Sequence, residues 1–381
     1  MREKSETGVY KMTTLAEIGN IKGNSNAITR WAKLGPYYAM FPIEFAFRTV
    51  EQYSEKGDYI IDPFAGRFSS VFAGAVLGRN SVGIEINPIG WIYGKTKLNP
   101  AKKEAVQKRL KQIYDQSFYY KTEAENLSEF FQLCFCPEVL RFLSCARKNL
   151  DWRKDNVDAT LAAIILVNLH GKIGESLSNQ MRQTKATAIN YSINWWKTND
   201  YCQPPRYNPL EFINKKIEWR YGKQTPQFKA NYAATYGDST EELKKIQVKS
   251  KKENIKFSLL FTSPPYYSVV NYHADQWLRL WFLNESDKSE NKYKKRFNSK
   301  EDYQKLLDSV FGQCAKIMTK KSTVFVRTDS REFTHNITLQ LLKKHFPQHS
   351  LEQRESYVDK NQTELFNNKS EKKEIDIILT A

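Results

Sequence analysis

Hydrophobic positions in this chain form short runs, and their clearest arrangement lies in residues 57–88. The apolar run Tyr59-Ile60-Ile61 is followed by a Gly-containing loop at residues 62–66, a helical stretch and a second apolar run at residues 81–87. Strand, loop, helix and strand in this order predict the first βαβ unit of a doubly wound α/β sheet. Later apolar runs predict further strands of the same, mostly parallel sheet, with helices between them: residues 257–262, 322–327 and 375–380.

Residues 98–230 interrupt this pattern with about 130 residues that a parallel sheet does not need, because its crossovers take only a dozen or more. Helical patterns at residues 159–170 and 209–221 predict that this insert is mainly helical. We therefore expect three parts: an N-terminal segment with the first part of the sheet domain at 1–97, a helical insert at 98–230 as the candidate recognition region, and the second part of the sheet domain at 231–381.

The chain is strongly basic, since 59 Lys and Arg residues against 42 Asp and Glu residues give a formal net charge of +17. Such an excess favours a polyanionic partner. With 40% hydrophobic and 13% aromatic residues the chain can bury a large core, which excludes wholesale disorder. No run of about 18 apolar residues occurs, and residues 1–10 are polar and charged. We therefore expect no transmembrane helix, no secretory signal, no membrane partner and a cytoplasmic location.

The cysteines and histidines do not form the pattern of a metal site. The closest of the five scattered cysteines, Cys134 and Cys136, are separated by one residue, whereas zinc sites usually have two to four residues between them. We interpret the cysteines as reduced thiols of the core. The histidines stand far apart, and Pro347 interrupts any helix that would bring His345 and His349 together. We therefore expect no metal cofactor.

A proline-rich segment directly after a predicted strand carries the strongest chemical signal. Residues 262–267 read Thr-Ser-Pro-Pro-Tyr-Tyr, and ligands of open α/β sheets bind at the carboxyl ends of the strands. Two prolines hold a backbone carbonyl in a fixed direction, Ser263 adds an acceptor, and Tyr266 adds a flat face. This set suits a planar base that bears an exocyclic amine. Taken alone, the segment is better explained as a proline-stiffened turn, and its combination with residues 62–66 favours the binding loop instead.

Three motifs in combination resemble one protein family. Asp-Pro-Phe-Ala-Gly at 62–66, Gly-Ile-Glu-Ile-Asn-Pro at 83–88 and Thr-Ser-Pro-Pro-Tyr at 262–266 each lie at the end of a predicted strand. The combination resembles the DNA amino-methyltransferases, which use S-adenosylmethionine to methylate adenine N6 or cytosine N4. The resemblance covers residues 35–97 and 231–381. It implies a Rossmann-like methyltransferase fold with a mainly helical inserted domain.

The resemblance implies a role for each motif. The first motif would wrap the methionine part of the cofactor, and Glu85 would hold the ribose. The position of Glu85 also supports this role on physical grounds, because nucleotide-binding sheets bind ribose through an acidic residue at the end of the second strand. For Asp238 the alternative of a helix N-cap remains. The implied cofactor-binding residues are Tyr38, Phe41, Pro42, Asp62, Pro63, Phe64, Ala65, Gly66, Glu85, Ile86, Asp238 and Ser239, and the implied catalytic residues are Ser263, Pro264, Pro265 and Tyr266.

Two features depart from the family pattern. Family members commonly have a second glycine two positions after the one that corresponds to Gly66, but this chain has Phe68 there. If that position requires a positive φ, phenylalanine is costly there and the geometry of the cofactor loop departs from that of the family. The insert precedes the predicted third strand, which we place before residues 236–239, and this leaves the subclass open.

Basic residues of the insert are candidates for contact with double-stranded DNA. Residues 179–185 read Asn-Gln-Met-Arg-Gln-Thr-Lys, and amide and guanidinium groups read base edges while cations hold phosphates. We expect Arg182 and Lys185 to contact DNA, whereas Tyr191 and Trp195, at helical spacing, are favoured as core residues. Further candidates are Lys197, Lys294, Lys295 and Arg296.

The resemblance implies a site-specific DNA methyltransferase that flips its target base out of the duplex, with Tyr266 as the stacking platform. Serine at the first motif position, Ser263, favours cytosine N4 within the family, and adenine N6 is the alternative. An RNA or protein methyltransferase and a catalytically degenerate DNA-binding protein are the rival functions. The sequence leaves open which DNA site is recognised and whether a separate cognate restriction endonuclease accompanies the protein.

Overall fold

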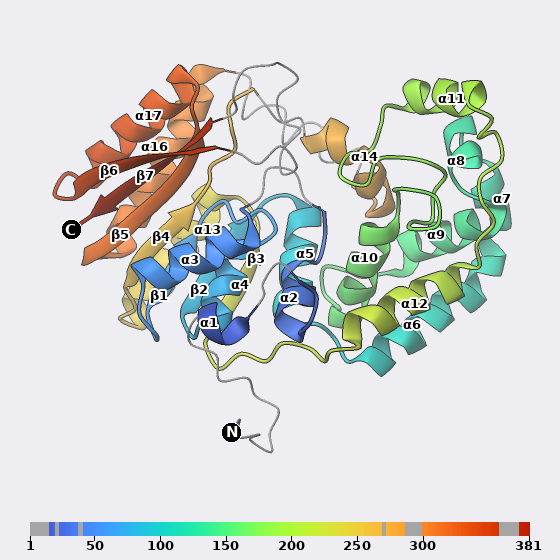
Figure 1. Ribbon diagram of the computed structural model, residues 1–381, viewed down its shortest axis with the longest axis horizontal. Coiled ribbons are helices and arrows are strands. Elements are labelled where there is room, and N and C mark those ends of the chain that lie inside the picture. The colour runs from blue at the N-terminus through green and yellow to red at the C-terminus, as the bar shows by residue number, and fades with distance from the viewer. Residues whose placement is uncertain (1–14, 20–22, 37–40, 269–271, 286–298, 358–372) are drawn as a thin grey trace.

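The computed structural model describes residues 15–19, 23–36, 41–268, 272–285, 299–357 and 373–381 (Figure 1). Four residues that the sequence singles out, Tyr38, Lys294, Lys295 and Arg296, lie outside the described residues. The described chain forms a sheet with helices on both faces, and a group of helices from the middle of the sequence lies beside it.

In the described part of the chain, seven strands form one sheet in the order β3-β2-β1-β4-β5-β7-β6. β7 runs antiparallel to both of its neighbours, and the other neighbouring strands are parallel. The strand order reverses between β1 and β4, which makes this pair the switch point of a doubly wound sheet. The predicted fold class is therefore confirmed. The strands are β1 (Tyr59–Asp62), β2 (Asn80–Glu85), β3 (Tyr232–Tyr236), β4 (Phe257–Thr262), β5 (Met318–Asp329), β6 (Ser350–Tyr357) and β7 (Lys373–Thr380).

Alternating side chains of the central strands enter two different hydrophobic cores. Ile60 and Phe261 belong to one core, and Ile61 and Leu260 belong to the other. Successive residues of a strand point to opposite faces, so strands covered on both faces read as nearly continuous apolar runs. The first core includes α3 (Ile43–Tyr53), α4 (Ser69–Val76) and α5 (Pro88–Leu98), and the second includes α13 (Ser239–Lys252), α16 (Lys300–Ile317) and α17 (Glu332–His345).

Helices fill the chain between α5 and β3. α10 packs against α5, and the buried side chains of both belong to the same core as Ile60. Because this core is continuous from the sheet into the insert, the domain boundaries at residues 98 and 230 stay a prediction. The helices of this part are α6 (Lys103–Gln116), the 3₁₀ helix η1 (Ser117–Tyr120), α7 (Lys121–Glu125), α8 (Glu129–Cys134), α9 (Pro137–Asn149), α10 (Asn156–Asn168), α11 (Ile189–Thr198) and α12 (Pro209–Tyr221). The remaining helices are α1 (Leu15–Ile18), α2 (Ala27–Ala32) and α14 (Tyr272–Phe282).

β6 is a strand that the hydrophobic pattern does not predict. Residues 351–355 are all exposed, and β6 pairs with β7 at the edge of the sheet. An edge strand without a buried face has no apolar period from which it could be recognised.

The cysteines are free, and four of the five are buried. Cys202 is exposed, so the interpretation as core thiols is wrong for this residue. Among the described residues there is no group of three His, Cys, Asp or Glu side chains arranged to hold a metal ion. Within the same ranges, no helix is long and apolar enough to cross a membrane.

Candidate functional site

The candidate site lies where β1 and β4 end side by side. Asp62 is the last residue of β1, and Thr262 is the last residue of β4. The Thr262 hydroxyl donates to Asp62 Oδ1 over 2.6 Å. Ligands of open α/β sheets bind in the crevice outside such strand ends. Two motifs that stand 200 residues apart in the sequence are therefore joined at the switch point.

The Asp62 carboxylate organises the loop that follows β1. Its Oδ1 also accepts from the Phe64 N–H over 3.1 Å, and its Oδ2 accepts from the Ser70 hydroxyl. Burial raises the pKa of Asp62 to about 6, against the opposing effect of the hydrogen bonds from Ser70, Thr262 and Phe64. These contacts hold the loop in place. Direct contact of Asp62 and its neighbours with a ligand stays a prediction.

Glu85, at the end of β2, ties together the loops that follow β1 and β2. Its Oε2 accepts from the Gly66 N–H over 2.7 Å, and its Oε1 accepts from the Asn87 N–H over 2.6 Å. A Cβ at Gly90 would lie 2.5 Å from the Gly66 carbonyl oxygen, so glycine permits this close approach. Burial raises the pKa of Glu85 to about 8, although hydrogen bonds from the N–H groups of Asn87, Gly66 and Ile86 lower it. The carboxylate retains capacity to accept another hydrogen bond.

Phe68 has the left-handed backbone that its position in the motif suggested. Its φ is 62° and its ψ is 38°, a conformation that costs roughly 1–2 kcal/mol for a residue with a Cβ. The side chain is fully buried, in a slot left by two glycines. A Cβ at Gly83 would lie 2.8 Å from the Phe68 ring, and one at Gly94 would lie 2.1 Å from it. Burial of the ring contributes roughly 1.5–3 kcal/mol, which offsets the strain and keeps the loop intact.

The end of β3 completes this edge of the site. The Gly237 N–H donates to the Glu85 carbonyl over 3.0 Å, and the Ser239 hydroxyl donates to the Pro63 carbonyl. Asp238 caps α13 by accepting from the Thr240 N–H over 2.9 Å. The N-cap role of Asp238 is therefore confirmed, and its contact with a cofactor stays a prediction.

Aromatic rings gather beside the end of β3, and sequence reasoning missed them. The ring centroids of Trp91 and Tyr236 are 5.1 Å apart, and those of Trp152 and Tyr236 are 6.2 Å apart. The Trp91 indole N–H donates to the Ala234 carbonyl over 2.9 Å. Trp91 belongs to α5, whereas Trp152 precedes α10 in the insert. No sequence spacing could have shown that these residues meet.

Phe41 and Pro42 lie on the side of the sheet that carries α3. The Phe41 ring stacks on Phe261 of β4, with 4.6 Å between the centroids and 15° between the ring planes. Pro42 precedes the first residue of α3, and its carbonyl accepts from the Ala46 N–H over 3.0 Å. The structure therefore brings this aromatic segment to β4, whose end carries the proline-rich loop.

The proline-rich loop is held by side chains from strands at the other half of the sheet. The Ser263 hydroxyl hydrogen-bonds to the Tyr266 hydroxyl, which donates to Glu374 Oε1 over 2.9 Å. Arg327 lies 3.3 Å from Glu374 and forms a bidentate pair with Asp376 over 2.6 and 2.8 Å. The Tyr266 side chain is only 6% exposed. Its role as a stacking platform stays a prediction, whereas its hydrogen bonds give it a positioning role.

Arg331 fixes the end of the same loop. Its guanidinium donates to the Tyr267 carbonyl over 2.6 Å and pairs with Asp329 Oδ2 over 2.6 Å. The Tyr267 ring packs against Tyr303 and Phe333, with centroids 5.7 and 5.2 Å away. Arg331 lies 64 residues from Tyr267 in the sequence, so no local motif could have revealed this contact.

α14 links the proline-rich loop to the segment 180–187 of the insert. It follows the loop in the sequence and reaches into the helical part (Figure 1). The buried Arg279 donates to the Gln183 carbonyl over 2.6 Å, and the Trp277 indole N–H donates to the Thr187 carbonyl over 3.1 Å. The backbone of the candidate DNA-contact segment is therefore held by the helix that continues from the candidate catalytic loop.

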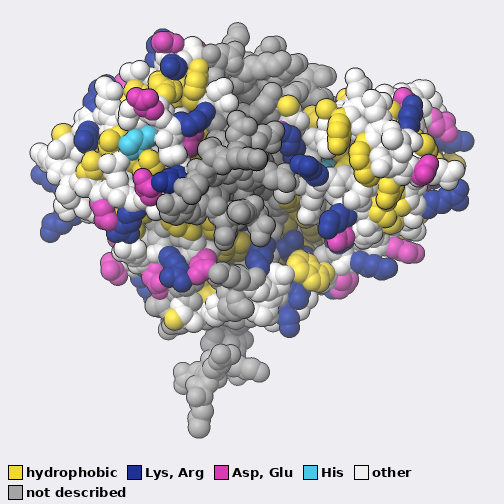
Figure 2. All heavy atoms as spheres, turned by 45° about the horizontal axis from the view of Figure 1, so that its top comes forward, with side chains coloured by type: hydrophobic (Ala, Val, Ile, Leu, Met, Phe, Trp, Pro, Cys, Tyr) yellow, Lys and Arg dark blue, Asp and Glu magenta, His cyan; other side chains and the backbone are white. Residues whose placement is uncertain are grey.

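Three predicted DNA contacts of the insert are exposed side chains. Arg182, Lys185 and Lys197 are exposed. Lys185 pairs with Asp275 over 2.6 Å, and Lys197 pairs with Glu129 over 2.5 Å. Lys197 and Glu129 are both exposed, and exposed ion pairs contribute little to stability, so Lys197 can exchange its carboxylate for a phosphate. Asp275 is buried, so Lys185 also balances a buried carboxylate. Figure 2 shows Lys and Arg side chains spread over both the sheet half and the helical half of the visible face.

The assignment of Tyr191 to the core is wrong. Tyr191 is 61% exposed, and Trp195 is half-buried, with its ring stacked 5.2 Å from that of Tyr201. The inward face of α11 instead carries Trp196, which is fully buried and donates to the Gln180 carbonyl over 2.9 Å. The helical spacing is correct, but the buried face is shifted by one residue.

Comparison with known proteins supports the resemblance drawn from the motifs. Residues 4–89 match the family model described as DNA methylase. The chain is 43% identical over 49 residues to the type II methyltransferase M.MthZI of Methanothermobacter thermautotrophicus, which covers 13% of this chain and 14% of that protein. It is 26% identical over 299 residues to the type II methyltransferase M.BsoBI of Geobacillus stearothermophilus, which covers 70% of this chain and 55% of that protein.

Each of these matches spans about half the length of the curated relative or less. Among solved structures, the chain is similar to the rRNA methyltransferase aviRa from Streptomyces viridochromogenes, with a TM-score of 0.31, 9% identity, and 91% of this chain and 87% of that chain covered. The family match and the curated relatives confirm the resemblance to the N6/N4 DNA methyltransferases.

Proposed function

We propose that this chain, which carries the motifs of the S-adenosylmethionine-dependent N6/N4 DNA methyltransferases, moves a methyl group from that cofactor to the exocyclic amine of a DNA base. The observation that carries the proposal is the contact between the ends of β1 and β4 at the switch point of the sheet. Thr262 of the proline-rich motif hydrogen-bonds to Asp62 of the cofactor motif over 2.6 Å, and Glu85 hydrogen-bonds to the same cofactor loop at Gly66. A cofactor and a base bound at these loops would be neighbours.

The residues at this edge fit the cofactor chemically. The Glu85 carboxylate accepts from the backbone N–H groups of Gly66 and Asn87, and its remaining lone pairs can accept a hydrogen bond from a ribose hydroxyl. The partly exposed ring of Tyr236, backed by the buried Trp91, offers flat apolar surface for an adenine ring near Asp238 and Ser239. When bound, S-adenosylmethionine supplies an electrophilic methyl group on a sulfonium sulfur.

The proline-rich loop would bind the exocyclic amine of the target base through hydrogen bonds. The reaction needs no covalent bond between the protein and the base. The Ser263 hydroxyl donates to Tyr266, and Tyr266 donates to Glu374, so the lone pairs of the Ser263 oxygen remain available. With the Pro264 carbonyl, this oxygen would accept the two amine hydrogens and draw the nitrogen lone pair out of conjugation with the ring. That lone pair would form the new N–C bond while the C–S bond breaks with its electrons left on sulfur, and the amine would then lose its proton to solvent.

Cytosine N4 is the favoured target, because Ser263 stands at the first position of the proline-rich motif. Adenine N6 remains the alternative, since either amine can donate to the same two acceptors. Incubation of the purified protein with unmethylated duplex DNA and the cofactor, followed by nucleoside mass spectrometry, should yield N4-methylcytosine. Methyladenine as the sole product would contradict the cytosine assignment.

A radiolabelled methyl donor tests which class of polymer accepts the methyl group. Parallel reactions with duplex DNA, RNA and a protein extract should transfer the label to DNA. Transfer to RNA or protein alone would favour those rival functions. Absence of cofactor binding by calorimetry would favour a degenerate DNA-binding protein. The same DNA products, mapped by sequencing, identify the recognised site and show whether it matches that of a separate nuclease.

A further inference from the structure

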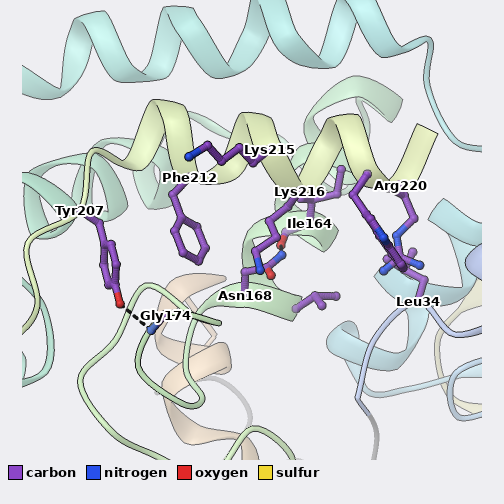
Figure 3. Close-up of a pocket in the computed structure, with 11 residues that line it drawn as sticks. Leu34, Ile164, Asn168, Gly174, Tyr207, Phe212, Lys215, Lys216 and Arg220 are labelled. Atoms are coloured by element: carbon purple, nitrogen blue, oxygen red, sulfur yellow. Dashed lines mark hydrogen bonds between the residues drawn. The ribbon is translucent and has the colours of Figure 1, made fainter. Parts of the chain in front are cut away.

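A cavity of about 670 Å³ lies beneath α12, apart from the strand ends described above (Figure 3). Its volume is within the range of small-molecule sites. Three aromatic residues line it, Tyr207, Phe212 and Trp219, together with three cations, Lys215, Lys216 and Arg220. Figure 3 shows Lys216 and Arg220 reaching from α12 toward Asn168 and Leu34, with Phe212 and Tyr207 at the other end. Among the described residues, the lining includes no Asp or Glu.

The cations of this cavity stand next to flat rings. The Lys216 ammonium lies 4.9 Å from the Phe212 ring centroid, and the Arg220 guanidinium lies 4.9 Å from that of Trp219. Lys216 donates to the Glu175 carbonyl over 3.1 Å. Burial lowers the pKa of Lys216, against the opposing effect of the nearby Glu175 carboxylate. A ligand that enters between these groups meets positive charge and aromatic surface together.

Behind the Leu34 end of the cavity, Arg220 is joined by two more buried basic side chains, Arg67 and Lys97. Arg67, Lys97 and Arg220 are each less than a tenth exposed. Their side chains donate to backbone carbonyls of residues 30–35: Arg220 to Arg30, Lys97 to Ala32 over 3.3 Å, and Arg67 to Gly35 over 3.0 Å. Within the described part of the chain, none of the three forms an ion pair with a carboxylate, and Arg67 Nε has no hydrogen-bond partner.

Uncompensated buried charge is costly, and nearby charges act strongly where water is excluded. Burial, followed by the charges of Arg67 and Arg220, holds the pKa of Lys97 well below its usual range. An anion placed in the adjoining cavity would relieve this repulsion. Phosphate is the common biological anion that lysine and arginine together bind, and aromatic side chains bind the flat face of a base.

We propose that the cavity beneath α12 binds a nucleotide unit, with its phosphate near Lys215, Lys216 and Arg220 and its base against Phe212 or Tyr207. Free nucleotides and a nucleotide of a nucleic-acid strand share this chemistry. The inference rests on the cavity alone and does not depend on methyl transfer. Loss of cofactor binding would therefore leave it standing, and its failure would leave the proposed methyltransferase untouched.

Calorimetry with the full chain tests the proposal. Thymidine monophosphate is a suitable probe, because thymine carries no exocyclic amine and is not the base of the cofactor. It should bind, whereas thymidine and inorganic phosphate should each bind at least roughly tenfold more weakly, since each lacks half of the contacts. A short labelled oligothymidylate, followed by fluorescence anisotropy, distinguishes a strand from a free nucleotide: a strand-specific site binds the oligonucleotide and not the monophosphate.

Substitutions then assign the binding to this cavity. The double variant Lys215→Gln, Lys216→Gln should weaken whichever of the two probes binds by roughly tenfold or more, and Phe212→Leu should weaken it separately. The matched control is Lys251→Gln, Lys252→Gln, which removes two adjacent exposed lysines of α13 and should leave binding unchanged. Absence of binding by both probes, equal binding of inorganic phosphate, or unchanged binding in the double variant and Phe212→Leu would each overturn the proposal.

Discussion

Replacement of Glu85 by glutamine should abolish a pH dependence of cofactor binding. The carboxylate is buried, and its pKa is raised to about 8, so most of it is protonated in the free protein at lower pH. If ribose hydroxyls donate to this group, the cofactor binds the ionised form, and a proton must leave when it binds. Affinity should therefore rise with pH up to about 8 and level off above it.

The size of the effect follows from the position of that pKa. Each pH unit below the pKa lowers the affinity about tenfold, which corresponds to ~1.4 kcal/mol. Between about pH 9 and about pH 6, the dissociation constant should rise roughly 100-fold, or ~2.7 kcal/mol. In the Glu85→Gln variant this slope should disappear. At high pH the variant should bind more weakly by roughly 1–3 kcal/mol, because a charged acceptor is lost.

Isothermal calorimetry over this pH range measures both quantities. Titrations in buffers of different ionisation enthalpy also count the protons released, which should approach one per cofactor below the pKa for the wild type and fall toward none for the variant. Asp308→Asn, on α16, is the control, since this partly exposed carboxylate is paired with Lys344 and His345, away from the strand ends, and should leave the profile unchanged. A wild-type slope in the folded Glu85→Gln protein would remove Glu85 from the ribose role.

Three further predictions concern other parts of the structure. Gly94→Ala should destabilise the fold by roughly 1–3 kcal/mol or more, because its Cβ would meet the Phe68 ring at 2.1 Å. Denaturant unfolding should show that Phe68→Leu restores part of the stability lost in Gly94→Ala. If the stability losses of the two substitutions simply add, the ring and the glycine do not share one packing site. Arg331→Lys removes the guanidinium fork that holds the Tyr267 carbonyl. It should lower kcat roughly tenfold or more with unchanged cofactor affinity, and an equal change in both would indicate a general structural role. Arg182→Ala with Lys185→Ala should flatten the plot of log DNA affinity against log salt by roughly two. An unchanged salt slope and specificity would place the DNA-binding surface elsewhere, and the α13 lysine pair again serves as the control.

The sequence by itself determined the central strands of the sheet and marked the loop that follows β1. The runs at β1, β4 and β5 are apolar because both faces of each strand are buried. Successive residues point to opposite faces, so nearly every residue of such a strand has to be hydrophobic. The loop residues 62–66, Glu85 and the proline-rich segment were recognisable for a related reason. Each of these patterns lies within one short stretch of chain and the strand that precedes it, so the information that identifies it is local.

Tertiary structure alone decided the rest, because the relevant partners are far apart in the sequence. Phe68 tolerates its left-handed backbone because Gly83 and Gly94 leave room for its ring, and neither glycine signals this by itself. Spacing predicted the α11 helix, but only packing against Gln180 selected Trp196 over Tyr191 as its buried residue. Contacts across the sheet likewise set the Glu374 and Arg331 supports of the proline-rich loop. A side chain's neighbours across the fold depend on how whole elements pack, and no period within one element encodes that packing.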